Sequence, residues 1–530
     1  MVATDAAKQI ALGWIEDNRQ RLSDFHLEIW NYAETAYREY RSAAAFVELL
    51  RREGFEVEEG SGNMPTAFKA SWGEGAPVLG TYAEYDAVPG NSQQAVPYEA
   101  PRDGLHRWAP GHTDPHSSLG VAALMGVLGA KEAMQRDGLH GTLAIFGEPA
   151  EKVCGSKPAH AAKGYYDGFD AFISYHPHTT STTILDTHCG SYWSAVFTFQ
   201  CVEPEKWGER RLLASPDRQH TVARCPGAID ALCLMYTNTN YTKEAMFPHT
   251  GTWTLNEFIM AGGQCTSDNL PPRFSQIQSA WRSPTLNVQQ QIFDVLERNA
   301  RHAAEVTGCV VSHQWVTKTR VGLANHAMAE LTYRNLEAVG APAYEDEARA
   351  FGRAIQENLG LDPMDDPFTE DNQRLTSPSE WEDAQRQSLP PWQVNFTSDD
   401  YVDYTWHAPT VRLHTSRPRL STPPGYTYPA WVLNAMAGRP ECIDPGMFVA
   451  GKTIATTFVD LLTRPEELEK AQAEFRERTG GGVGGDNWVA PLLSSDFRPP
   501  VDLRWPEYVQ TARGEEWWLP TPLAREAAAT

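Results

Sequence analysis

Three things that the sequence lacks limit what this protein can be. It has no run of about 18 apolar residues, and the segment Met1 to Gln20 carries charges where a signal peptide is apolar. Its eight cysteines are scattered and form no CxxC pair, so nothing indicates a zinc ribbon or a disulfide framework. Basic residues number 45 against 68 acidic ones, and the net charge of −23 argues against nucleic acids and anionic membranes as partners. We therefore expect a cytoplasmic protein with reduced thiols that acts on a small molecule.

A chain of 530 residues is too long for one core, and its hydrophobic pattern changes twice. Strand-like and helical segments alternate up to residue 178, which is typical of an α/β domain with a largely parallel sheet. A long alternating strand then opens a block in βαββαβ order, typical of an antiparallel sheet with one wet face. We predict one α/β domain from residues 1–188 and 322–478, an inserted α+β domain over 189–321, and a C-terminal extension over 479–530 that packs on the first domain.

The finer pattern predicts individual elements. Apolar residues at helical spacing predict two helices within residues 5–53, and a small-residue pattern predicts a helix over 120–133. Further helices are predicted over 327–339, 345–358, 450–462 and 465–477. Residues 361–395 are polar and rich in proline, which indicates a surface excursion.

One loop carries an unusual density of chemical groups. In the stretch Gly111–Gly120, His112, Asp114 and His116 place two imidazoles and a carboxylate at the point where the chain enters a helix. Loop side chains at such a junction can converge on one metal or anion. Acidic groups and imidazoles also end three apolar, strand-like runs, at Leu79–Asp86, Leu143–Glu151 and Ala171–His178. Together these groups predict a single active site.

These motifs, in this order, resemble the amidohydrolase branch of the aminoacylase/carboxypeptidase metallopeptidase family, which includes hippurate hydrolases, auxin-conjugate hydrolases and aminobenzoyl-glutamate utilisation proteins. The similarity spans about residues 15 to 475. It rests on the motifs already quoted and on the segments 83–90, 149–151, 262–282 and 397–403. The resemblance implies a zinc-peptidase-like α/β catalytic domain with an inserted dimerisation or lid domain. It also implies one or two divalent metal ions and hydrolysis of amide bonds, often those of N-acyl amino acids.

The resemblance assigns roles to five residues around the loop. Asp114, His116 and His176 stand at metal-ligand positions, with Asp114 in place of the family's cysteine. A carboxylate remains a competent ligand and favours Mn, Fe or Zn in an oxygen-rich shell. Glu151 matches the general base that takes a proton from water, and Asp86 is expected to orient a histidine from behind.

Two further ligand positions depart from the family pattern. Lys152 stands where a second glutamate ligand is expected, and Tyr426 stands where a late histidine is expected. We therefore expect one ion rather than two. Two alternatives stay open: Lys152 supplies the positive charge of the second ion, or His414 or His407 replaces the late histidine.

The inserted domain adds three candidates through the same resemblance. His220 matches a histidine that reaches a partner subunit's site and steadies the oxyanion of the tetrahedral intermediate, which implies a homodimer. Asn269 and Arg282 match positions that bind polar groups of the substrate. Arg282 would hold a carboxylate through its planar fork, and Tyr426 is a further candidate for substrate binding.

The leading hypothesis is an amidohydrolase that cleaves a small N-acyl- or aminobenzoyl-amino-acid-like amide by metal-activated water, with Glu151 as general base. One alternative is the same fold with different chemistry, either a lyase or a metal-independent hydrolase that uses Lys152, Glu151 and Tyr426. The other is a binding protein that keeps the pocket without turnover.

Overall fold

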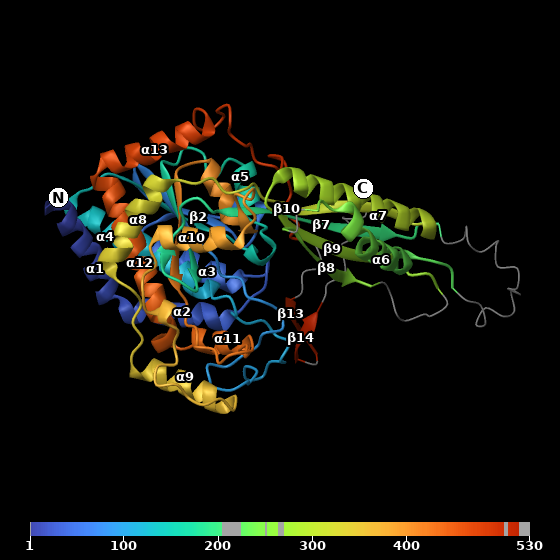
Figure 1. The fold of residues 1–530 in the computed structure, drawn as a ribbon, viewed down its shortest axis with the longest axis horizontal. Helices are drawn as coiled ribbons and strands as arrows, with labels where there is room; N and C mark the ends of the chain where they lie inside the picture. Colours follow the sequence, from blue (N-terminus) through green and yellow to red (C-terminus); the bar gives the residue numbers. More distant parts are fainter. Residues whose placement is uncertain are drawn as a thin grey trace, which may run out of the picture.

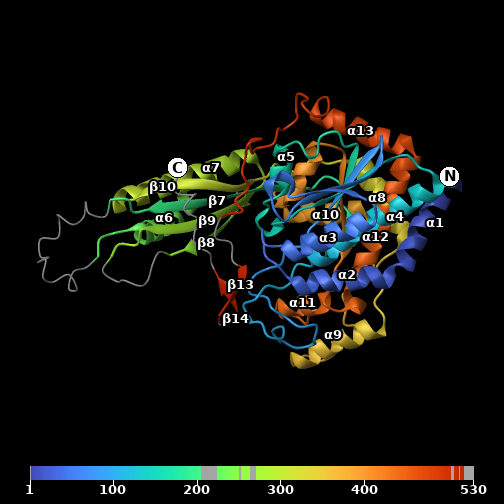
Figure 2. The ribbon, with the colours of Figure 1, turned by 180° about the vertical axis from the view of Figure 1, so that it is seen from behind.

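The structure is a computed structural model, and it describes residues 2–203, 224–249, 252–262, 270–502, 507–512 and 514–518. It has a large α/β body and a long, narrower second body that projects from one side (Figure 1). The same two bodies are seen from behind in Figure 2, with the N terminus at the end opposite the projection.

The large body is built on a seven-stranded sheet in the order β1-β2-β4-β3-β5-β12-β6. Its strands are β1 Glu56–Glu59, β2 Phe68–Glu74, β3 Val78–Ala83, β4 Gly141–Gly147, β5 Ala171–His178, β6 Thr182–Thr183 and β12 Thr410–Ser416. The four central strands, β4, β3, β5 and β12, run parallel to one another. Since parallel strands end at the same edge of a sheet, the residues that follow these four strands are brought together.

The helix α4 (His116–Asp137) is the central helix of this body, and every residue from Leu119 to Ala130 in it is buried. Small residues let it approach its neighbour α12 (Pro440–Thr463) closely. A Cβ atom on Gly126 would lie 2.3 Å from Ile454, and one on Gly451 would lie 2.4 Å from the sulfur of Met125. The small-residue pattern predicted for this helix is thus explained by close packing.

The other helices surround the sheet. They are α1 Val2–Asp17, α2 Arg19–Tyr32, α3 Tyr40–Arg52, α5 Lys157–Ala162, α8 His326–Val339, α9 Asp346–Asn358, α10 Pro378–Ser388, α11 Trp431–Ala437 and α13 Pro465–Thr479. Two helices were predicted in the N-terminal region, but the structure has three, because a further break at Asn18 separates α1 from α2. The polar excursion over residues 361–395 contains the helix α10, which Ser377 caps by accepting a hydrogen bond from the Glu380 amide. Among the described helices, none combines the length and apolarity that crossing a membrane requires.

The second body has the βαββαβ order predicted for the insertion: β7 Cys189–Gln200, α6 Ala228–Met246, β8 Thr254–Ala261, β9 Phe274–Ser283, α7 Leu286–Thr307 and β10 Val310–Lys318. Its sheet has the order β10-β7-β9-β8 with antiparallel neighbours, and α6 and α7 share one apolar core with it. The short strand β11 (Phe396–Ser398) joins the first residues of β7 and links the two bodies. The predicted α/β fold with an inserted α+β domain is confirmed, while the exact domain boundaries stay a prediction.

After α13 the chain turns at Gly480 and returns along the large body. The Trp488 indole donates to the Trp406 carbonyl at 2.5 Å, and the Arg320 guanidinium donates to the Val489 carbonyl at 2.9 Å. Further on, β13 Glu507–Thr511 and β14 Gly514–Trp518 form an antiparallel hairpin, an element that the sequence analysis did not predict.

Candidate active site

The carboxyl ends of the parallel strands and the start of α4 bring the predicted residues together. Asp114 Oδ2 lies 3.6 Å from His116 Nε2 and 3.7 Å from His176 Nε2. His116 Nε2 lies 3.2 Å from Glu151 Oε2. The cluster of Asp114, His116, Glu151, Lys152 and His176 is called the centre below.

Lys152 lies in the middle of the centre. Its ammonium donates to His116 Nε2 at 2.8 Å, Asp114 Oδ2 at 3.0 Å and Glu151 Oε2 at 3.1 Å. Burial opposes the charge, but the carboxylates of Asp114 and Glu151 raise the pKa of Lys152 well above its ordinary value. Three donors are thus shared among three acceptors, two at the start of α4 and one in the turn that carries Lys152 itself.

Asp86 supports the centre from behind and is fully buried. His116 Nδ1 donates to its Oδ1 at 2.7 Å, and the Lys152 backbone amide donates to its Oδ2 at 2.9 Å. Burial and the Lys152 charge oppose protonation of His116, but Glu84 and Asp86 raise its pKa to about 9. His116 Nδ1 is bonded to Asp86 and Nε2 lies 2.8 Å from Lys152 Nζ, a contact with room for one proton, which the ammonium donates to Nε2.

His176 ends β5 with its ring perpendicular to that of His116, at 5.6 Å between centroids. Its Nδ1 donates to the Pro177 carbonyl at 2.7 Å, which leaves Nε2 as an acceptor facing Asp114. Burial lowers the pKa of His176 to about 4, so the imidazole is neutral at neutral pH. A neutral imidazole with a free Nε2 is the form that binds a metal ion.

Arg417 follows β12 and was not predicted. It donates to Asp114 Oδ1 at 3.1 Å, so each oxygen of this carboxylate meets a cation. Partial burial opposes the charge of Asp114, but Lys152, His176, His116 and Arg417 hold its pKa well below the usual range. The position of Arg417 at a strand end was the available signal, but only the fold pairs two residues so distant in sequence.

A second, largely buried cluster adjoins the centre and was also missed. Lys157 donates to Glu84 Oε1 and Asp400 Oδ1, both at 2.6 Å, and Asp399 pairs with the Arg412 guanidinium. Glu84 Oε2 has no hydrogen-bond partner in the described part of the chain. Burial raises the pKa of Glu84 to about 7, against the attraction of Lys157. The motif over residues 397–403 had marked the two aspartates as part of the resemblance without indicating what they contact.

Three groups of side chains place donor atoms within 4.8 Å of one another and could hold a metal ion. The first is Glu84, His116 and His176, the second is Asp86, His116 and Glu151, and the third is Glu151, Asp399 and Asp400. Candidate ligands are therefore present. They include His116 and His176 of the three predicted ligands, and Glu84, which was not predicted.

Other predicted residues lie elsewhere. In the described part of the chain, no hydrogen bond or ring contact joins Tyr426 to the centre, and its ring packs on Tyr428 at 5.3 Å. His407 precedes β12, at the opposite edge of the sheet, and its Nδ1 contacts Asp167 at 3.0 Å. His414 is the neighbour of His176 in the ladder between β12 and β5, but its ring stacks on that of His178 at 4.4 Å. His220 and Asn269 lie outside the described residues.

Arg282 reaches the neighbourhood of the centre from the second body. It lies on β9 with its guanidinium 4.9 Å from the ring centre of Tyr192. Tyr192 packs with Cys154, which follows Glu151 by one short turn. No acidic side chain of the described ranges forms an ion pair with Arg282. A guanidinium that stacks on an aromatic ring near the centre, and that pairs with no acidic side chain of the described residues, is suited to bind a carboxylate.

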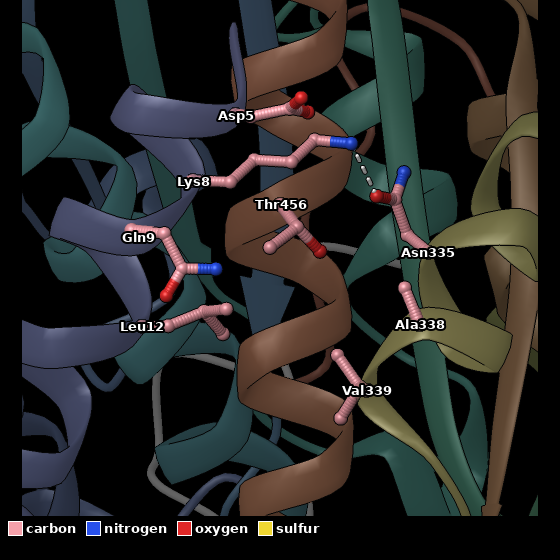
Figure 3. A pocket seen from close by; sticks show the side chains of 8 residues that line it. All are labelled: Asp5, Lys8, Gln9, Leu12, Asn335, Ala338, Val339 and Thr456. Atoms are coloured by element: carbon pink, nitrogen blue, oxygen red, sulfur yellow. Dashed lines mark hydrogen bonds between the residues drawn. The ribbon is translucent and has the colours of Figure 1, made fainter. Parts of the chain in front are cut away.

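A separate cavity of about 230 Å³ lies between α1, α8 and α12 (Figure 3). Its lysine, Lys8, is already bonded to Asn335 at 2.8 Å and to Asp460 at 2.7 Å. None of the residues that line it belongs to the centre.

The sequence and the fold were compared with known proteins. The model of the family described as "Peptidase family M20/M25/M40" matches residues 80–380, a range that contains the whole centre. One of the p-aminobenzoyl-glutamate hydrolase subunits of Escherichia coli is 26% identical over 475 residues, which cover 88% of this chain and 94% of that protein. The human Xaa-Arg dipeptidase is 26% identical over 314 residues, 56% of this chain and 63% of that protein.

Among solved structures, the aminobenzoyl-glutamate utilization protein from Klebsiella pneumoniae superposes with a TM-score of 0.52 at 12% identity. The superposition covers 84% of this chain and 98% of that one. At this identity the likeness concerns the fold.

Proposed function

The chain belongs to peptidase family M20/M25/M40, and from this premise we propose that it is an amidohydrolase acting on a small N-acyl- or aminobenzoyl-amino-acid-like amide. The two relatives are named as a hydrolase of an aminobenzoyl amino acid and as a dipeptidase, and both names support this reaction class. Metal dependence is typical of the family.

The observation that carries the proposal is the position of Glu151. Its Oε2 is fixed by the Lys152 ammonium at 3.1 Å and lies 3.2 Å from His116, while no described residue donates to Oε1. A carboxylate with one anchored and one open oxygen is placed to take a proton from a water molecule. The water oxygen attacks the amide carbon, and Glu151 then passes the proton to the departing nitrogen.

The donor set fits one divalent ion, and the fit rests on two open donors. Glu84 Oε2 is buried and accepts no hydrogen bond from the described residues, and His176 Nε2 is left as an acceptor because Nδ1 donates to Pro177. We propose that His176, His116 and Glu84, whose donor atoms lie within 4.8 Å of one another, hold one ion of Zn, Mn or Fe. The oxygens of Asp114, predicted as a ligand, are bonded to Lys152 and Arg417 instead. Such an ion lowers the pKa of bound water and polarises a carbonyl group when it is present.

Substrate binding is assigned to Arg282, with His220 and Asn269 as further candidates from the predicted set. The absence of an acidic partner among the described residues supports Arg282 as the group that binds the substrate carboxylate. This places a free carboxylate on the amino-acid side of the scissile amide.

Glu151→Gln tests the assignment. Loss of the base should lower kcat by about 10²–10⁴-fold for release of the free amine from aminobenzoyl-glutamate or an N-acyl amino acid, with an unchanged Tm. The matched control is Glu469→Gln on the exposed face of α13, which should keep full activity. Full activity of Glu151→Gln would remove the proposal.

The contacts of the Lys152 ammonium with Asp114, His116 and Glu151 favour a second candidate, a metal-independent hydrolase of the same substrates. Exhaustive treatment with a chelator separates the two. Activity that disappears and returns with Zn or Mn supports the first candidate, and activity that persists without bound metal supports the second.

We also propose that the protein is a homodimer formed through the second body. β8 is an edge strand, and its Phe258 and Ile259 are 52% and 58% exposed. An apolar edge strand can pair with another chain. Light scattering should give twice the chain mass for the wild type and the single chain mass for Phe258→Lys with Ile259→Lys. A cytoplasmic location stays a prediction.

A further inference from the structure

Two of the donor groups share His116, and they are called below the His176 side and the Glu151 side after the residue that each adds. Glu84 and His176 complete the group on one side, and Asp86 and Glu151 complete the group on the other. His116 Nε2 is 3.2 Å from Glu151 Oε2 and 3.6 Å from Asp114 Oδ2. Two ligands of one tetrahedral ion with bonds of about 2.1 Å would be about 3.4 Å apart. His116 Nε2 is therefore spaced from Glu151 Oε2 and from Asp114 Oδ2 as two ligands of one ion would be.

Lys152 contacts every member of the group on the Glu151 side. Its backbone amide donates to Asp86 at 2.9 Å, and its ammonium donates to His116 at 2.8 Å and to Glu151 at 3.1 Å. No described residue fills the other side in this way: Glu84 Oε2 has no hydrogen bond there. One side is thus occupied by a covalently attached cation, and the other keeps an open donor.

Two sets of hydrogen bonds hold the backbone around Lys152 in place. Asp86 accepts hydrogen bonds from the backbone amide of Lys152 and from the ring of His116. One carboxylate therefore positions both the lysine backbone and the imidazole to which the lysine ammonium donates. Ala150, two residues before Lys152, has a left-handed φ of 59°, and its amide donates to the buried Glu39 at 2.8 Å. The turn that carries Glu151 and Lys152 is therefore anchored to the body.

Arg417 completes the arrangement on Asp114. It donates to Oδ1 at 3.1 Å, while Lys152 donates to Oδ2 at 3.0 Å. A carboxylate that bridged two metal ions would offer one oxygen to each. Here a guanidinium and an ammonium take those two places.

We infer that the ammonium of Lys152 is a built-in cation that replaces a metal ion on the Glu151 side, so that the centre takes at most one divalent ion, on the His176 side. Lys152 is then a positioning residue, which holds Glu151 and Asp114 where an ion would hold them. Only the role of Lys152 in catalysis rests on the proposed function. The number of ions bound is a property of the centre alone.

Lys152→Glu is the decisive variant, because it removes the cation and adds a carboxylate at the same point. The metal-free protein is titrated with Mn²⁺ and Zn²⁺ by calorimetry, and the dialysed protein is analysed for metal by plasma mass spectrometry. We expect one ion or none per chain in the wild type, and one additional ion per chain in Lys152→Glu. The control Lys470→Glu makes the same change on the exposed face of α13 and should leave the ion count unchanged.

Two ions per wild-type chain would overturn the inference, because Lys152 would then be a neutral amine beside or bound to a metal. A folded Lys152→Glu with an unchanged ion count would also overturn it. If that variant fails to fold, the wild-type count decides alone. No substrate is needed, so failure to find amide hydrolysis would leave this result standing.

Discussion

The ammonium of Lys157 lies 2.6 Å from Glu84 Oε1, and both side chains are fully buried. The same ammonium lies 2.6 Å from Asp400 Oδ1, also buried, and 4.6 Å from the ring centre of Tyr82. Since Oε1 of Glu84 is taken by Lys157, Oε2 is left to face His116 at 3.4 Å. Lys157 therefore aims the open oxygen of Glu84 at the centre.

Lys157→Met should be strongly destabilising. It leaves the carboxylates of Glu84 and Asp400 buried without their cation, and breaking a buried ion pair in this way costs about 3–5 kcal/mol. Urea unfolding measures the loss. Lys470→Met, on the exposed face of α13, should change the free energy of unfolding by less than about 0.5 kcal/mol. A Lys157→Met protein as stable as this control would show that the two acids do not depend on the ammonium.

Asp86→Asn should reduce activity more than stability. The substitution keeps the shape of the side chain, but the amide nitrogen cannot accept the hydrogen bond that Asp86 takes from the Lys152 amide. Loss of a group that orients a metal-binding histidine usually costs about 10–100-fold in metal affinity or activity. We expect kcat/KM for the amide substrate to fall within that range. Asp137→Asn, on an exposed turn of α4, is the matched control and should have no effect.

The sequence predicted the part of the centre that follows from strand ends. Apolar runs that end in Asp86, Glu151 and His176 could be read as parallel strands, and parallel strands end at one edge. The loop of Asp114 and His116 enters a helix as predicted, although α4 begins at His116 itself. The order of the inserted elements was likewise readable, because alternation with period 2 and helical spacing differ clearly.

What the sequence could not predict was which charges meet. Arg417 contacts Asp114 across a separation of 303 residues, and Lys157 contacts Asp400 across 243. No local pattern pairs such residues, because only the return of β12 beside β5 brings them to one edge. Lys152 was recognised as an exchange at a ligand position, but its contact with three acceptors depends on the turn that carries it. The break at Asn18 was missed because neither Gly nor Pro marks it.

His26 should make the protein less stable in mild acid. It is fully buried, and burial lowers its pKa to about 3, against about 6.5 in an unfolded chain. Between these values the unfolded chain binds a proton that the folded chain does not. The stabilisation is therefore complete above pH 6.5 and falls by about 1.4 kcal/mol for each pH unit below it.

Urea unfolding at pH 7.5 and pH 5.5 tests this contribution. His26→Gln, which cannot titrate, should lose about 1.4 kcal/mol less than the wild type between the two pH values. His302→Gln, on the exposed face of α7, should follow the wild type. Equal losses in all three proteins would assign the acid sensitivity to other groups.

Arg282 should control affinity for the substrate's carboxylate more than the chemical step. Its guanidinium stacks on Tyr192 and has no acidic partner in the described residues, so it is free to form a bidentate pair with a carboxylate. Removing a charge-assisted hydrogen bond costs about 1.5–3 kcal/mol, which is about a 10–100-fold change in affinity. We expect Arg282→Gln to raise KM within that range with little change in kcat. Arg282→Lys should have a KM between those of the wild type and Arg282→Gln, since an ammonium keeps the charge but not the planar fork.

A substrate whose carboxylate is replaced by a carboxamide separates binding of the carboxylate from a general effect on the site. The wild type should lose affinity for this analogue, while Arg282→Gln should treat the acid and the carboxamide alike. Arg298→Gln, on an exposed turn of α7, is the control and should keep the wild-type preference. If Arg282→Gln retained that preference as well, another cation would have to bind the carboxylate, and Arg417, which already meets Asp114 at 3.1 Å, would be the next residue to vary.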